Sequence, residues 1–215
     1  MLRAFITGLP QGFARIFAPR YLVWHAVAII VTYLCVASGF DWYYFTQTRF
    51  NNLFELTIPA AILGFFLPII VPVVLYYFGE WRRSAKLKHI AVVVAQAEAL
   101  GWLVSSIYKA FTGRIQPELL HSTGLQDISR QFNFGFLENG IFWGWPSSHT
   151  TVAFAGVAAL IYFLYPKHKV LSVLLGVYAL YIGLGVSVSV HWFSEFAAGA
   201  IFGTLIGIVV ARHAK

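Results

Sequence analysis

Charged residues are scarce in this chain, at 11% of its 215 residues, whereas soluble domains carry about 25%. Hydrophobic residues make up 59% of the sequence, and the mean hydropathy is +0.73. This shortage of charge excludes an ordinary soluble domain and indicates an integral membrane protein. Cysteine is nearly absent as well, and the lone Cys35 excludes an intramolecular disulfide.

Signatures of several other chemistries are also missing. No His/Cys spacing typical of a zinc site is present, and neither a Walker loop nor a dinucleotide fingerprint occurs. The net charge of +7 comes from basic residues scattered among the loops, without the stripe that nucleic-acid binding needs. We therefore expect no metal, no cofactor and no nucleic-acid partner.

Long apolar runs account for most of the sequence. A membrane-spanning helix needs about 20 predominantly apolar residues. Six segments qualify, at 21–39, 56–78, 89–111, 147–165, 169–190 and 194–211. The stretch from Thr112 to Pro146 is long and aromatic, and such loops are usually functional or disordered. The sequence predicts an all-α membrane protein, a six-transmembrane helix bundle with a long outer loop between spans three and four.

Two smaller features complete this organisation. Glycines at 199, 203 and 207 recur every four residues in the last span, which indicates close helix packing. Residues 1–20 mix apolar side chains with arginines, as an amphipathic helix in the membrane interface does; a frayed tail is the alternative. We expect no cleavable signal, because no small-residue cleavage site follows the first apolar run. Residues 21–215 then form one six-span domain.

The distribution of Lys and Arg predicts the orientation, because cytoplasmic loops carry an excess of both. With the N-terminus inside, eleven basic residues fall on the inner side: Arg3, Arg15, Arg20, Arg82, Arg83, Lys86, Lys88, Lys167, Lys169, Arg212 and Lys215. The outer side holds four: Arg49, Lys109, Arg114 and Arg130. Both termini are therefore expected in the cytoplasm, with the long loop and the starts of spans four and six outside. A bacterial inner membrane suits the small size and compact loops.

One candidate motif opens span four, where Pro146 precedes Ser147, Ser148 and His149. Pro and Ser favour a helix start, and the free N–H groups there attract anions with help from the helix dipole. His149 on the first turn is then placed to protonate a leaving oxygen as a general acid. An ordinary capped helix with an interfacial histidine is the alternative.

A second candidate motif places Glu195 four residues after His191, so that a helix would carry both on one face. A carboxylate beside an imidazole fixes its tautomer and stabilises its charged form, as a histidine nucleophile requires. Burying an ionisable pair in a membrane is costly and is usually functional. The alternative is a pair that only satisfies two buried polar groups.

Three charged residues belong to span three or its outer end. Lys109 and Arg114 are placed to hold phosphate oxygens, although two snorkelling cations are the alternative. Glu98 lies well inside the span, so we expect a buried structural or protonated carboxyl rather than a catalytic one.

Taken in order, these motifs resemble the membrane-bound type 2 phosphatidic acid phosphatase superfamily, whose site is shared with vanadium haloperoxidases. That family shows Lys, six residues, Arg-Pro; then Pro-Ser-Gly-His; then Ser-Arg, five residues, His, three residues, Asp. The chain has Lys109 with Gln116-Pro117, then Pro146-Ser147-Ser148-His149, then Leu184-Gly185 with His191 and Glu195. The resemblance covers about residues 55–211 and implies six spans with the site on the outer face.

The chain departs from the family pattern most at its two arginines. Gln116 stands at the arginine of the first motif, and Gly185 stands at that of the third. The resemblance therefore implies a divergent member, in which Arg114 or Arg130 is expected to replace the missing phosphate-binding groups.

The resemblance also implies a reaction. His191 attacks phosphorus to form a phosphohistidine, His149 protonates the leaving group, Ser147 and Ser148 contact the phosphate, and water releases phosphate without a metal. The expected function is hydrolysis of a phosphomonoester or pyrophosphate of a membrane lipid. Two alternatives are a lipid phosphotransferase that uses the same histidine and a catalytically impaired homologue that binds lipid phosphate. Undecaprenyl pyrophosphate, phosphatidylglycerophosphate, phosphatidic acid and lipid A phosphate are all candidate substrates, and the oligomeric state is left open.

Overall fold

The structure is a computed structural model and describes residues 2–49, 53–117 and 126–214. Within those ranges the regular elements are all helical, apart from an isolated bridge between Arg114 and Phe132. The α-helices are α1 (Leu2–Ile16), α2 (Leu22–Ala37), α3 (Phe40–Arg49), α4 (Thr57–Trp81), α5 (Ala85–Thr112), α6 (Ser148–Leu164), α7 (Lys169–Ser187) and α8 (Phe193–His213), with 3₁₀ turns at Pro19–Tyr21 and Leu53–Leu56. The predicted all-α class is confirmed.

Five stretches of the described chain are long and apolar enough to cross a membrane: Pro19–Ala37, which contains α2, together with α4, α5, α7 and α8. The remaining predicted span is α6, an apolar helix of 17 residues. At 1.5 Å per residue it is about 25 Å long, slightly less than the roughly 30 Å hydrocarbon core. All six predicted segments are thus helices, and the crossing by α6 stays a prediction.

The outer face of the bundle is apolar. Side chains along α2, α4 and α7 are exposed, among them Ile30, Phe65 and Val173, whereas α5 and α8 are largely buried. An apolar surface of this extent is not tolerated in water but suits lipid. The chain is therefore an integral membrane protein.

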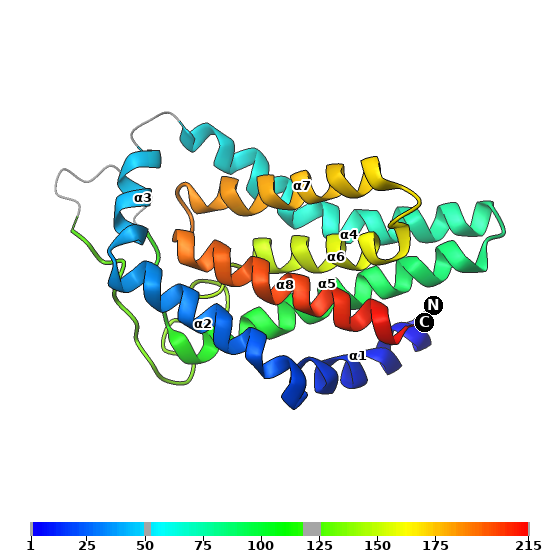
Figure 1. Cartoon of the computed structure of the whole chain (residues 1–215), viewed down its shortest axis with the longest axis horizontal. Helices are drawn as coiled ribbons and strands as arrows, with labels where there is room; N and C mark the ends of the chain where they lie inside the picture. The colour runs from blue at the N-terminus through cyan, green and yellow to red at the C-terminus, as the bar shows by residue number, and fades with distance from the viewer. Residues whose placement is uncertain (1, 50–52, 118–125, 215) are drawn as a thin grey trace.

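Helix α6 lies at the centre and packs against α5, α7 and α8 (Figure 1). Its contact with α8 depends on the predicted glycine stripe: a Cβ at Gly199 would lie 2.9 Å from the Ser147 carbonyl oxygen, and Gly203 and Gly207 face carbonyls one and two turns further on. The missing side chains let the two backbones approach closely, and this fixes the start of α8 beside the start of α6.

One end of the bundle collects the segments that carry the candidate motifs. Figure 1 shows α3, the loop after α5 and the starts of α6 and α8 at this end, whereas the two chain termini lie near the other end. Part of that loop, residues 118–125, falls outside the described residues. The segments that carry the candidate motifs therefore lie together at one end of the bundle, as predicted.

The N-terminal segment is a helix packed on the bundle. Helix α1 contacts α5 and α8, and Gln96 Nε2 donates to the carbonyl oxygens of Ala4 at 2.9 Å and Phe5 at 3.0 Å. Gly12 lies so close to Leu100 that an added Cβ would be 2.7 Å from its Cδ1. The position of this helix in the membrane interface stays a prediction.

Candidate active site

His191 and Glu195 form a buried pair at the α7–α8 junction. His191 lies in the turn between the helices and Glu195 in the first turn of α8, and they are 2% and 0% exposed. Nδ1 of His191 lies 2.5 Å from Glu195 Oε2. Burial lowers the pKa of His191, and Glu195 opposes that effect. In the neutral ring, a proton on Nδ1 donates to this carboxylate and leaves the lone pair of Nε2 free.

The start of α6 lies beside this pair. Ser147 caps the helix, accepting from the backbone N–H of Thr150 at 3.5 Å, and its own N–H donates to the Glu195 carbonyl at 3.2 Å. His149 follows in the first turn, and its ring centroid is 6.2 Å from that of His191. The two histidines predicted as acid and nucleophile are brought together.

Helix α5 contributes polar groups to the same region. Ser105 Oγ lies 2.9 Å from Ser148 Oγ, which ties α5 to the start of α6. Lys109 is one turn further along and buried, and its Nζ donates to the Phe142 carbonyl at 2.9 Å. Since an ammonium has three donors and Phe142 is its acceptor among the described residues, Lys109 retains donors for an anion.

Arg114 is buried and bonded to protein groups. Its Nη1 donates to Ser194 Oγ at 2.6 Å, and its Nη2 donates to Asp41 Oδ2 at 2.6 Å and to the Ser129 carbonyl at 2.9 Å. Its Nε lies 3.6 Å from Glu195 Oε1. Both terminal nitrogens thus have acceptors within the protein, and the predicted binding of phosphate by Arg114 stays a prediction.

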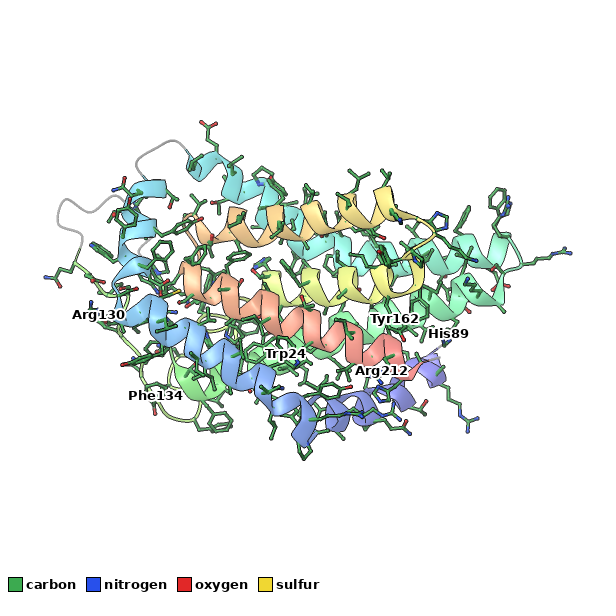
Figure 2. The ribbon with its side chains drawn as sticks, viewed as in Figure 1. Trp24, His89, Arg130, Phe134, Tyr162 and Arg212 are labelled. Atoms are coloured by element: carbon green, nitrogen blue, oxygen red, sulfur yellow. The ribbon has the colours of Figure 1, made fainter. Side chains whose placement is uncertain are left out.

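Arg130 lies apart from the buried cluster. Its side chain is exposed, and its guanidinium is beside Gly39 at the junction of α2 and α3 (Figure 2). It is not among the described contacts of either histidine. Phosphate binding by Arg130 therefore also stays a prediction.

The packing around Gly185 explains why this position has no arginine. A Cβ at Gly185 would collide with the Cβ of Ala60 and lie 3.2 Å from the Leu56 carbonyl oxygen. Thr57 Oγ1 also donates to the Gly185 carbonyl at 2.9 Å. Helices α4 and α7 approach too closely here for an arginine side chain, so the departure from the family pattern is built into the packing.

Gln116, which stands where the family has an arginine, contacts the Glu195 carboxylate. Gln116 Nε2 lies 3.2 Å from Glu195 Oε1 and 3.3 Å from Oε2. Its Oε1 is buried with no hydrogen-bond partner among the described residues. Gln116 therefore supports Glu195 where the family's arginine is expected to meet phosphate.

Asp41 is a buried residue of the site that was not predicted from the sequence. This fully buried carboxylate at the start of α3 accepts from the Ser194 N–H at 2.8 Å, the Ser194 hydroxyl at 2.6 Å and Arg114. The available signal was weak: one acidic residue in an aromatic stretch just after the first apolar run. Glu98, by contrast, is buried as expected, within the bundle against Gly156.

The arrangement suits attack on an anionic electrophile. A neutral imidazole held by a carboxylate can act as a nucleophile, and the helix N-terminus with Lys109 favours a bound anion. The described residues include no group of three or more His, Cys, Asp or Glu that could hold a metal ion.

Comparison with known proteins gives consistent matches. The family model of the PAP2 superfamily matches residues 88–214. The chain is 28% identical over 184 residues to a PA-phosphatase related-family protein of Dictyostelium discoideum, covering 74% of this chain and 65% of that protein. It is 31% identical over 182 residues to a Schizosaccharomyces pombe protein described as "Probable diacylglycerol pyrophosphate phosphatase 1", covering 73% of this chain and 64% of that protein. The chain thus spans just under two thirds of the length of these relatives.

A solved structure has the same fold. The crystal structure of a transmembrane PAP2 type phosphatidylglycerolphosphate phosphatase from Bacillus subtilis matches with a TM-score of 0.61 and 19% identity, covering 89% of this chain and 94% of that one. At this identity the match concerns the fold alone.

Proposed function

The chain belongs to the PAP2 superfamily, and from that premise we propose that it is a lipid phosphatase that hydrolyses a phosphomonoester or pyrophosphate of a membrane lipid. The observation that carries the proposal is the 2.5 Å contact between His191 Nδ1 and Glu195, with His149 facing the same imidazole. A merely structural pair would have no need of a second imidazole beside it.

The geometry supports a two-step reaction. Nε2 of His191 attacks phosphorus while the bond to the leaving oxygen breaks and His149 donates a proton to that oxygen. Water then attacks the phosphohistidine, the N–P bond breaks, and the proton lost by water returns to His149. Glu195 holds Nδ1–H throughout and stabilises the positive charge that develops on the ring. The chain's own groups suffice for both steps, without a metal.

We propose that phosphate oxygens bind between the start of α6 and the end of α5. The Ser148 N–H and the hydroxyls of Ser147 and Ser148 are at the positive end of a helix dipole, and Lys109 supplies a buried cation. Arg130 enters only if the headgroup reaches the outer loop. In that case Arg130→Ala raises KM and leaves kcat unchanged.

The proposed topology has six spans with the site outside. Helix α6 is short, but it is surrounded by α5, α7 and α8, so its ends need not reach both lipid surfaces by themselves. The excess of Lys and Arg at the opposite end supports an extracytoplasmic site with both termini in the cytoplasm. Placement in a bacterial inner membrane belongs to the same proposal.

The relatives and the candidate lipids predicted from the sequence together give the substrates to test. The purified chain in mixed micelles would be offered phosphatidic acid, diacylglycerol pyrophosphate, phosphatidylglycerophosphate or undecaprenyl pyrophosphate, with and without an acceptor lipid. We expect phosphate release that His191→Ala abolishes. The control His89→Ala should retain activity, because His89 is exposed near the opposite end (Figure 2).

Each alternative gives a different result in this assay. Transfer of phosphate only in the presence of an acceptor lipid would indicate a phosphotransferase. Equal inactivity of the wild type and His191→Ala on every lipid, together with retained binding of lipid phosphate, would indicate the catalytically impaired homologue. The packing that excludes an arginine at position 185 is the observation that favours this last alternative.

A further inference from the structure

Asp41 connects a helix outside the family-matched region to the catalytic pair. It lies on α3, whereas the family model begins at residue 88. Its Oδ1 accepts from the backbone N–H of Ser194 at 2.8 Å, and its Oδ2 accepts from Ser194 Oγ at 2.6 Å and Arg114 Nη2 at 2.6 Å. Ser194 immediately precedes Glu195, so two of the three bonds hold the turn that carries the carboxylate, and the third holds Arg114 beside it.

Arg114 lies between two carboxylates at unequal distances. Its guanidinium is 2.6 Å from Asp41 but 3.6 Å from Glu195 Oε1, which is beyond hydrogen-bonding distance. The rings of Phe132 and Trp192 flank it, with centroids 4.9 Å and 5.7 Å from its central carbon. The cation is thus directed to Asp41 and does not compete with His191 for Glu195 Oε2.

We propose that Asp41 is a positioning residue for the nucleophile: by holding Arg114 and the start of α8, it keeps the Glu195 carboxylate on Nδ1 of His191. The inference rests on the proposed function and extends its machinery to a residue outside the three family motifs. A buried cation that loses its partner is left uncompensated at a high energetic cost, Glu195 is the nearest other carboxylate to Arg114, and a guanidinium fits a carboxylate well. Without the charge of Asp41, Arg114 would therefore compete with His191 for Glu195.

Loss of the Asp41 charge should change the pH dependence of the reaction. The charged and titratable groups that face His191 are Glu195 from α8, Arg114 from the segment after α5, Lys109 from α5 and His149 from α6. In Asp41→Asn the two cations are opposed by one carboxylate only, so the pKa of His191 falls. Attack requires the neutral ring, so the acid limb of the kcat/KM profile moves to lower pH.

The test compares Asp41→Asn with the wild type and with Glu138→Gln in the complete chain in micelles. Glu138 is an exposed carboxylate at the same end of the bundle, so its variant controls for loss of one negative charge. We expect kcat of Asp41→Asn to fall by about 10–100-fold, as for outer partners that orient metal-bound histidines. KM should change little, the acid limb should shift to lower pH, and Glu138→Gln should behave as the wild type.

Loss of folded protein is separated from loss of positioning by expressing kcat per folded molecule. An unchanged kcat on this basis, with an unmoved acid limb, overturns the proposal. If Asp41→Asn does not fold, Ser194→Ala takes its place, because it keeps both charges and removes the hydroxyl that bridges them. We expect a smaller loss of kcat in the same direction, and an unchanged kcat again overturns the proposal.

A second measurement is independent of turnover. Nitrogen-15 NMR of histidine-labelled protein reports the titration of His191 in folded Asp41→Asn and in the wild type. A lower pKa in the variant supports the positioning role, and an identical titration refutes it. If the wild type hydrolyses no lipid while the His191 titration still shifts, the proposed function fails and the inference about Asp41 stands.

Discussion

Replacing Glu195 by Gln should inactivate the protein through the wrong histidine tautomer. In the wild type Oε2 faces His191, whereas Oε1 faces Arg114 Nε and both oxygens lie near Gln116 Nε2. A glutamine at 195 keeps its amide oxygen toward those two donors and turns its NH₂ toward the imidazole. Nδ1 must then accept a hydrogen bond, which moves the ring proton to Nε2 and removes the attacking lone pair.

The size of this effect follows from the same reversal in the Ser-His-Asp triad, where Asp→Asn costs about 10⁴ in kcat. At 1.36 kcal/mol for each tenfold change, that is about 5.4 kcal/mol of transition-state stabilisation. Glu195→Asp, the family's residue, keeps the charge and the acceptor. We therefore expect Glu195→Asp to lose up to about 10²-fold, because the shorter side chain displaces the carboxylate from Nδ1, which is still much less than the loss in Glu195→Gln.

The assay is release of inorganic phosphate from a lipid phosphate in mixed micelles, with each variant quantified as folded protein. The expected order is wild type, then Glu195→Asp, then Glu195→Gln at the level of His191→Ala. If Glu195→Gln keeps activity within about tenfold of the wild type, Glu195 does not set the tautomer of His191, because the amide NH₂ cannot accept the hydrogen bond from Nδ1–H.

Three further outcomes are expected. His149→Ala should slow hydrolysis of phosphatidic acid by about 10²–10⁴-fold and slow an aryl phosphate with a good leaving group much less; equal losses on both would argue against a general acid. Gly185→Ala should lower the free energy of unfolding in detergent by about 1–3 kcal/mol, because its Cβ meets Ala60, and an unchanged Tm would contradict this packing. Glu138→Cys in a Cys35→Ala background should react with an impermeant thiol reagent on intact cells, and labelling only after lysis would reverse the proposed orientation.

Much of the fold could be predicted because lipid demands long apolar helices. Each predicted span corresponds to a helix, and the clearest difference is at α5, predicted to start at residue 89 but beginning at Ala85. The four extra residues include Lys86 and Lys88, which apolarity excludes from a span. A helix can nevertheless extend beyond the membrane, and here Ser84 caps it by accepting from the Leu87 N–H.

Elements that lie outside the apolar runs were harder to predict. Helix α3 (Phe40–Arg49) is short and mixed in polarity, so neither a span nor a clear amphipathic period marks it. It forms because its aromatic rings pack on the start of α8, where Phe40 lies 5.0 Å from Phe193 between centroids. That contact is tertiary and leaves no local trace in the sequence.

Some residues of the candidate site could be predicted from local spacing, and others could not. His191 and Glu195 could be paired because four residues is one helical turn. The partnership of Asp41 with Arg114 spans 73 residues and could not be predicted from local spacing. Gly185 is similar: the motif shows a missing arginine, but only the closeness of α4 shows that an arginine side chain could not fit.

The phosphohistidine on His191 can be trapped during turnover. During turnover of a hydrolysed lipid phosphate, the wild type would be quenched in alkali, in which a phosphohistidine survives, and the peptides analysed by mass spectrometry. We predict one phosphoryl group on His191 in the wild type and none in His191→Ala. Steady turnover with no phosphoryl group on His191, or hydrolysis by His191→Ala at the wild-type rate, would contradict the account.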